Sequence, residues 1–331
     1  MSSGKPINRL LLLVLKISIA VFFITILVQK EKLSLTVFRP VLNAPGWLAL
    51  AGFCFSVIVI GGALRWNTLL AVQGIRLPFY RVLQFSMIGF FFNILLPGAT
   101  SGDIIKAYYT ASAGHGKKFA AVFTVIADRV FGLFVLCIIT GICTTITLLA
   151  EWPAWLEHPG KIALYSFGIA IGAAAILGGA GYYFLRFNPN GFVKNLLEKH
   201  VQNNTITQIG SVMGVYRKKP KALFQVILYS TAAHFSMFVA LFSFGRALGD
   251  SLPLGRYICI LPFGLIINAL PLSPGGIGVG EQGFETIFSL FGSGYGAPVC
   301  AMLHASMILI AIAGAVVYLL SGKKPREEAI D

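Results

Sequence analysis

The sequence has very little charge for its length, and this scarcity excludes most classes of soluble protein. Only 11% of its 331 residues are charged, whereas 56% are hydrophobic and the mean hydropathy is +0.81. Such a composition is typical of a polytopic membrane protein. The longest stretch without a membrane-length apolar run, roughly residues 186–221, is too short for a catalytic domain with its own core.

Cysteines and signature motifs are equally scarce. The five cysteines lie in apolar segments, and their odd number argues against a disulfide framework. No Cys/His cluster has metal-ligand spacing, and no Walker, dinucleotide or Ser-His-acid motif is present, so we expect neither a metal nor a cofactor. The formal net charge of +14 is spread over short loops without an aromatic platform, which argues against nucleic acid as a partner.

The sequence has long apolar runs instead. Six runs are long enough to cross about 30 Å of hydrocarbon as helices, and they are residues 10–28, 47–64, 119–150, 162–185, 222–248 and 297–320. Two further runs, 82–96 and 257–270, are too short to cross. Apolar residues spaced mostly three to five apart predict an amphipathic helix at about 191–217, on the cytoplasmic surface.

Both short runs end in a break that has the same order of residues. Each contains Asn, then Pro-Gly, then Gly followed by an acid, as in Asn93, Pro97-Gly98 and Gly102-Asp103. The second break contains Asn268, Ser273, Pro274, Gly275, Gly276, Gly278 and Gly280-Glu281. A helix cannot continue through such residues, and a break at membrane depth is tolerated only where it is buried in protein or lines a wet cavity.

These elements predict an all-α integral membrane protein, a helical bundle of about six full spans plus two re-entrant broken helices. Residues 1–331 form a single transmembrane domain with two inverted repeats, about 10–150 and 162–320. The two breaks then enter from opposite faces and meet near the midplane, where inverted-repeat transporters bind their substrate. If either broken segment crosses fully, the symmetry fails.

The distribution of basic residues predicts the orientation. With the N-terminus inside, 18 Lys and Arg residues fall on cytoplasmic segments and 6 on outer segments. This asymmetry indicates cytoplasmic N- and C-termini and an attraction of the cytoplasmic face for anionic lipid.

Charged residues within spans and breaks are the candidates for function, because each costs about 2.5 to 3.5 kcal/mol to insert. They are Arg65, Asp103, Lys106, Asp128, Arg129, Glu281 and Glu285, joined by His234 and His304. Asp128 and Arg129 are adjacent on a helix and need different partners, either as a structural pair or as part of a site. Asp103 and Glu281 either stabilise the start of a helix or bind a cation or proton beside amides that bind a phosphate. The two histidines are expected to bond between helices, and the two asparagines to bond freed backbone groups.

Several of these residues resemble a known family. Arg65-Trp66 with Leu69, Leu70 and Gly74, the Asn93 to Asp103 segment, Asp128-Arg129, and Leu270-Pro271 through Glu281 are similar to the flippase-like membrane domain of bacterial lysylphosphatidylglycerol synthase. The resemblance implies a multi-pass protein of the bacterial cytoplasmic (inner) membrane that moves lipids with modified headgroups between leaflets. It implies a stand-alone member without the aminoacyltransferase domain, because the chain ends about ten residues after its last predicted span.

The sequence and the resemblance together predict a flippase rather than an enzyme. The predicted substrate is a membrane phospholipid, with an aminoacylated or glycosylated headgroup among the options, and a homo-oligomer or a separate synthase partner stays open. The substrate-binding residues are expected to be Arg65, Asn93, Pro97, Gly98, Gly102, Asp103, Lys106, Asp128, Arg129, Asn268, Ser273, Pro274, Gly275, Gly276, Gly278 and Glu281. Two alternatives are an enzyme or accessory subunit acting on lipid-linked sugars and an ion-coupled transporter of small solutes.

Overall fold

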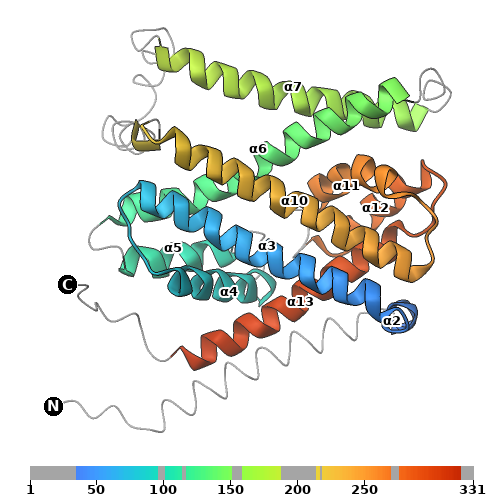
Figure 1. Cartoon of the computed structure of the whole chain (residues 1–331), viewed down its shortest axis with the longest axis horizontal. Coiled ribbons are helices and arrows are strands. Elements are labelled where there is room, and N and C mark those ends of the chain that lie inside the picture. The colour runs from blue at the N-terminus through green and yellow to red at the C-terminus, as the bar shows by residue number, and fades with distance from the viewer. Residues whose placement is uncertain are drawn as a thin grey trace.

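The protein is a bundle of long helices. The computed structural model describes residues 35–95, 101–113, 117–150, 159–187, 214–216, 218–269 and 276–321. Five helices in these ranges are long and apolar enough to cross a membrane, and they are α3 (Pro45–Val72), α6 (Lys118–Ala150), α7 (Pro159–Phe187), α10 (Pro220–Leu248) and α13 (Gly296–Leu320) (Figure 1). They confirm five of the predicted spans and make this a multi-pass membrane protein. The span predicted at 10–28 lies outside the described residues, as does nearly all of the amphipathic helix predicted at 191–217.

The first described span is longer than the sequence predicted. The expected span ended at Leu64 because Arg65 follows it, whereas α3 continues to Val72. The helix continues because Arg65 pairs inside the protein with Asp128, and the next turn buries Trp66 completely. A short helix, α2 (Leu35–Leu42), precedes this span.

Two helical hairpins lie at the predicted breaks. The first consists of α4 (Phe79–Leu95) and α5 (Ser101–Ala113), and the second of α11 (Leu254–Ala269) and α12 (Val279–Ser289). The first hairpin lies at the end of the bundle where α3 ends and α10 begins, and the second at the opposite end (Figure 1). That the hairpins enter the membrane without crossing it stays a prediction.

The two halves of the chain pack reciprocally. A long helix, a hairpin and a second long helix follow one another as α3, α4–α5 and α6, and again as α10, α11–α12 and α13. The paired long helices run in opposite directions, α3 against α10 and α6 against α13 (Figure 1). The hairpin of each half packs on the last helix of the other half, because α4 lies against α13 and α11 lies against α6. This exchange is the arrangement that an approximate twofold axis between inverted halves produces.

The hydrophobic core is densest around the second hairpin. Its fully buried aromatic side chains are Phe238, Phe244, Tyr257, Phe263, Phe284 and Phe288. A smaller cluster around the first hairpin contains Trp66, Leu70, Val82 and Phe85. The first hairpin is therefore held partly by polar contacts, and these form the candidate site.

Candidate functional site

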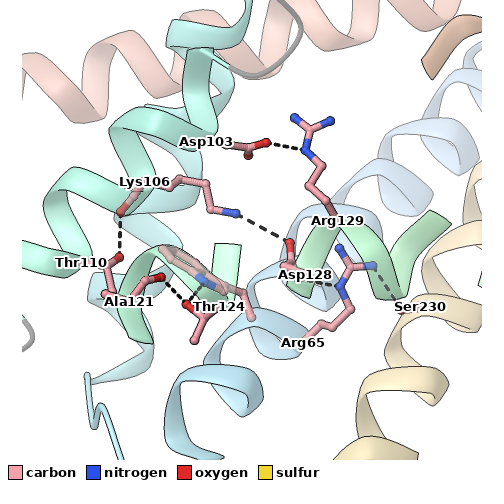
Figure 2. A network of polar contacts seen from close by, with 10 residues as sticks. Arg65, Asp103, Lys106, Thr110, Ala121, Thr124, Asp128, Arg129 and Ser230 are labelled. Carbon is pink, nitrogen blue, oxygen red and sulfur yellow. Dashed lines mark hydrogen bonds and ion pairs between the residues drawn. The ribbon is translucent and has the colours of Figure 1, made fainter. Parts of the chain in front are cut away.

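Five charged side chains from α3, α5 and α6 meet beside the first hairpin. We call them the charged cluster: Arg65, Asp103, Lys106, Asp128 and Arg129. They lie far apart in the sequence, and the packing of the three helices brings them together (Figure 2). All five were predicted site residues.

Asp128 lies at the centre of the charged cluster. One carboxylate oxygen accepts a hydrogen bond from Arg65 Nε at 2.7 Å, and the other is 3.8 Å from Lys106 Nζ. The three side chains are only 10 to 15% exposed. Arg65 also donates from Nη1 to the Ser230 hydroxyl of α10 at 3.1 Å. Because each buried charge has partners of opposite charge, the cost of burial is largely offset.

Lys106 is held in place by an aromatic face as well as by Asp128. Its Nζ lies 4.2 Å from the centroid of the Trp66 ring, which is a cation–π contact. The indole N–H of Trp66 donates to the Thr124 hydroxyl at 3.3 Å, which fixes the plane of the ring. The Lys106 ammonium therefore has a defined position in the protein interior.

Arg129 forms the open edge of the charged cluster. Its Nε donates to Asp103, and its side chain is 49% exposed while that of Asp103 is 16% exposed. Asp128 and Arg129 thus face different partners, as their adjacency predicted. The cluster holds three basic side chains and two carboxylates, so it carries one surplus positive charge, with Arg129 accessible to a ligand.

The geometry of the first hairpin depends on an asparagine and a glycine. Asn93 of α4 accepts a hydrogen bond from the Gly102 backbone N–H at 2.8 Å, which confirms the prediction that Asn93 satisfies a freed backbone group. A Cβ on Gly102 would lie 2.0 Å from the carbonyl oxygen of Gly89. Only glycine permits α4 and α5 to approach this closely, and the approach places Asp103 and Lys106 beside α6.

The second break contains a smaller polar group. Glu281 accepts a hydrogen bond from the Gly278 backbone N–H at 2.6 Å, and its other oxygen is 2.7 Å from His304 Nδ1. Nε2 of His304 is 3.0 Å from the Asn268 side-chain oxygen. His304 bonds between helices as predicted, whereas the described partner of Asn268 is this side chain rather than a freed backbone group.

Two backbone amides at the breaks are engaged by side chains. The N–H of Gly102 donates to Asn93, and that of Gly278 donates to Glu281. The structure therefore supports the helix-start role of Glu281 over phosphate binding by these two amides. Near the first break, the cationic side chains of the described residues are Arg65, Lys106 and Arg129.

The remaining predicted residues have mixed outcomes. Gly276 and Gly278 have left-handed backbone angles, φ +79° and +91°, which favour glycine. Glu285 accepts a hydrogen bond from the Ala297 N–H at the start of α13, at 3.0 Å, which is a structural role. His234 bonds the Gly132 carbonyl of α6 at 3.0 Å, as predicted. Five predicted site residues lie outside the described part of the chain: Pro97, Gly98, Ser273, Pro274 and Gly275.

Three residues take part in these polar contacts although the sequence did not predict them as site residues. Ser230 had no signal, because serine is common in membrane helices. Trp66 and Thr124 were detectable only through the position of Trp66 next to Arg65.

An apolar groove lies near the first hairpin, between α3, α4 and α13. Its volume is about 560 Å³, and its lining includes Leu48, Phe55 and Ile60 of α3, Met87 of α4, and Leu309 and Ile310 of α13. The groove is open on one side. Helix α3 lines this groove and also carries Arg65 of the charged cluster, and α4 lines the groove and is part of the first hairpin. The groove and the cluster are therefore neighbours in the fold.

Comparisons with known proteins agree with this architecture. Residues 13–320 match the family described as the lysylphosphatidylglycerol synthase TM region. A UPF0104 membrane protein of Methanothermobacter thermautotrophicus is 23% identical over 303 residues, which cover 85% of each chain. The UPF0104 membrane protein PH1989 of Pyrococcus horikoshii is 40% identical over 85 residues, about a quarter of each chain (25%). No solved structure matches. Since the match covers nearly the whole chain, the protein belongs to the family of the lysylphosphatidylglycerol synthase transmembrane region.

Proposed function

We propose that this protein is a lipid flippase that moves a phosphate-bearing lipid between the leaflets of the cytoplasmic membrane. The observation that carries the proposal is the charged cluster, with its surplus positive charge and with the half-exposed Arg129 of α6 beside the first helix break. Such a group of charges is costly in a membrane protein and typically marks a substrate pathway. The family match adds a lipid-related context.

Arg129 is the residue we expect to bind the phosphate. A guanidinium matches the oxygens of a phosphate in a bidentate geometry, and charge-assisted hydrogen bonds of this kind are the strong ones. In the structure the Nε of Arg129 is held by Asp103. An incoming phosphate competes with the Asp103 carboxylate for Arg129, so binding and release are exchanges of one partner for another rather than the exposure of a bare charge.

The buried part of the cluster supports the electrostatics of binding. Lys106 is fixed between Asp128 and Trp66, and Arg65 between Asp128 and Ser230. Fixed charges cost little reorganisation when a ligand arrives, and they act strongly because little water screens them. We assign Arg65 and Lys106 to positioning and to the positive potential, and Arg129 to direct contact.

The apolar groove supplies a place for the hydrocarbon of the same lipid. It is lined by apolar side chains of α3 up to Ile60, and Arg65 follows five residues later, about 7.5 Å further along the helix at 1.5 Å per residue. We propose that a lipid whose acyl chain lies in the groove extends its headgroup along α3 toward the charged cluster. The headgroup crosses beside side chains that replace its lost hydration, while its chains stay in an apolar environment.

The orientation and the lipid class complete the proposal. We place both termini in the cytoplasm, in line with the distribution of basic residues. The phosphate is the feature that the cluster selects, so phospholipids with anionic, aminoacylated or glycosylated headgroups are the substrate class. Aminoacylation is not part of the proposed activity.

A leaflet-exposure assay in proteoliposomes tests the proposal. The panel is fluorescent phosphatidylglycerol, phosphatidylcholine, lysylphosphatidylglycerol and a phosphate-free glycosylceramide. We expect at least one of the phospholipids to change leaflets faster than in protein-free vesicles and the glycosylceramide to remain at the background rate. If folded protein leaves every phospholipid on its starting leaflet, or moves the phosphate-free lipid equally well, the proposal is wrong.

A further inference from the structure

A second group of reactive side chains lies at the other break, apart from the charged cluster. The donor atoms of Glu281, Cys300 and His304, one from each side chain, all lie within 4.8 Å of one another. Cys300 is fully buried, His304 is 4% exposed, and the Glu281 side chain is 19% exposed. A thiol, an imidazole and a carboxylate thus converge in a nearly dry part of the protein.

The helices bring these donors together for simple geometric reasons. Cys300 and His304 are four residues apart on α13, so their side chains lie on one face of the helix. Two ligands spaced i and i+4 on one helix are a common way to bind a metal ion, as in zinc-binding His pairs. Glu281 lies in the first turn of α12 and faces them. The sequence pattern alone did not single out Cys300, because its acid partner is 19 positions away on another helix.

A glycine next to Glu281 makes the close approach of α12 and α13 feasible. A Cβ on Gly280 would lie 3.1 Å from the Cys300 sulfur and 2.3 Å from the Asn268 side-chain oxygen. Any larger residue would push these atoms apart. The thiol therefore stays close to the carboxylate and the imidazole.

The hydrogen bonds of His304 favour a cation between it and Glu281. Its Nε2 lies 3.0 Å from the side-chain oxygen of Asn268, and the tautomer with its proton on Nε2 satisfies this contact and leaves Nδ1 as an acceptor. Its Nδ1 is 2.7 Å from a Glu281 oxygen. Two acceptor atoms at this distance need a shared positive species, which is a proton or a metal ion. Imidazole N–H groups that donate to an oxygen in this way are the usual outer support of a metal-binding histidine.

We propose that Glu281, Cys300 and His304 bind one divalent transition-metal ion of the zinc class. Sulfur, imidazole nitrogen and carboxylate oxygen are the donors that Zn²⁺ prefers, at bond lengths of about 2.0 to 2.3 Å. Donors around such an ion lie roughly 3.5 Å apart. Side-chain shifts of about an ångström bring the present spacings of 2.7 Å for Glu281–His304 and at most 4.8 Å overall to that value. A thiolate and a carboxylate neutralise the double charge, which suits a buried site. Three protein ligands leave a fourth position for water or an exchangeable ligand.

The test is a cobalt titration of the full chain, purified in detergent and treated with a chelator. Cobalt reports a thiolate ligand directly through its charge-transfer absorption. We expect one Co²⁺ per chain with such a band, displaced by Zn²⁺. Cys300→Ser should abolish the band, and His304→Gln should weaken binding at least tenfold, as loss of a supporting group already does.

The matched control is Cys54→Ser, which removes a different buried thiol, that of Cys54 on α3. This variant should keep the cobalt band and the metal stoichiometry. Thermal unfolding gives a second readout that does not depend on the band: Zn²⁺ should raise the unfolding temperature of the unsubstituted protein and of Cys54→Ser, but not of Cys300→Ser. Absence of bound cobalt and zinc in folded protein, or binding that survives Cys300→Ser unchanged, overturns the proposal. Neither outcome depends on lipid transport.

Discussion

The two hairpins share one framework and differ in what it holds. In the first, Asn93 lies against Gly102 and the side chain of Lys106 passes over Gly89. In the second, Asn268 lies against Gly280 and the ring of Phe284 passes over Gly264. A Cβ on Gly89 would be 2.9 Å from the Lys106 stem, and one on Gly264 would be 2.7 Å from the Phe284 ring.

The difference lies in the residue that occupies the equivalent place. Phe284 is fully buried in the aromatic core of the second hairpin. Lys106 instead reaches Asp128 and the Trp66 ring. At this position the second hairpin has apolar packing, whereas the first has ion pairs. The comparison teaches that the repeat supplies the geometry of a helix break, and that the residue at this one position decides whether the hairpin packs by apolar contacts or contributes to the charged cluster.

The largest effect on the first hairpin is expected when the central carboxylate, that of Asp128, is removed. Asp128→Ala leaves Arg65 and Lys106 buried beside each other without their shared counterion. We expect a loss of about 3 to 5 kcal/mol in the free energy of unfolding, as for other broken buried ion pairs. Denaturant unfolding in detergent micelles measures it.

The matched control removes both charges of the Arg65–Asp128 pair. Arg65→Met combined with Asp128→Leu deletes the closest pair and fills the space with apolar atoms, which should recover part of the lost stability, because Lys106 still lacks the Asp128 carboxylate. Lipid transport should be lost in Asp128→Ala and in the double variant. Equal stability of Asp128→Ala and the unsubstituted protein would show that the pairs do not hold the first hairpin.

The glycine contacts give a smaller, graded effect. In Gly102→Ala the new methyl group meets the Gly89 carbonyl oxygen at 2.0 Å, so backbone must move, and we expect a loss of about 1 to 3 kcal/mol. In Gly280→Ala it meets the end of the Asn268 side chain at 2.3 Å, which can rotate away. Gly280→Ala should therefore be the milder change, and the reverse ranking in thermal unfolding would contradict the geometry described for the hairpins.

A helix start in the second half provides a further test. Glu285→Ala removes the carboxylate that accepts from the Ala297 N–H at the start of α13. A lost cap of this kind typically costs about 1 kcal/mol. Thermal unfolding should show that loss, while phospholipid transport should persist, because Glu285 lies outside the charged cluster. A loss of transport with unchanged stability would place Glu285 in the substrate path.

The smallest effect on stability is expected at Arg129, whose pair with Asp103 lies at the open edge of the cluster. Arg129→Gln should change the free energy of unfolding by no more than about 1 kcal/mol, as for other solvent-accessible ion pairs. The measurement is again denaturant unfolding. A change as large as that of Asp128→Ala would mean that Arg129 is a structural residue.

The sequence predicted most of the fold because hydropathy governs it. The run at 119–150 became α6 (Lys118–Ala150), and the run at 297–320 became α13 (Gly296–Leu320). The predicted end of α3 was wrong, because a charged residue such as Arg65 is expected to lie outside the membrane. Its burial depends on Asp128, 63 positions away, and local pattern carries no information about such a partner.

The candidate site was predictable as a set of residues but not as an arrangement. Insertion cost alone singled out Asp128 and Arg129. Asp128 contacts Arg65 and Lys106, whereas Arg129 contacts Asp103. These different partners follow from the rotation and packing of α6, which the sequence does not display. The same reason hid Cys300, because its nearness to Glu281 depends on how closely α12 approaches α13.

The central claim is that Arg129 binds the phosphate of a transported lipid, and transport by three proteins of matched stability tests it most directly. In proteoliposomes with a phospholipid that the unsubstituted protein moves, Arg129→Gln should lower the rate to that of empty vesicles. Arg129→Lys should recover part of it, and Arg39→Gln, an exposed arginine of α2 outside the cluster, should leave it unchanged. Full transport by folded Arg129→Gln would contradict the account.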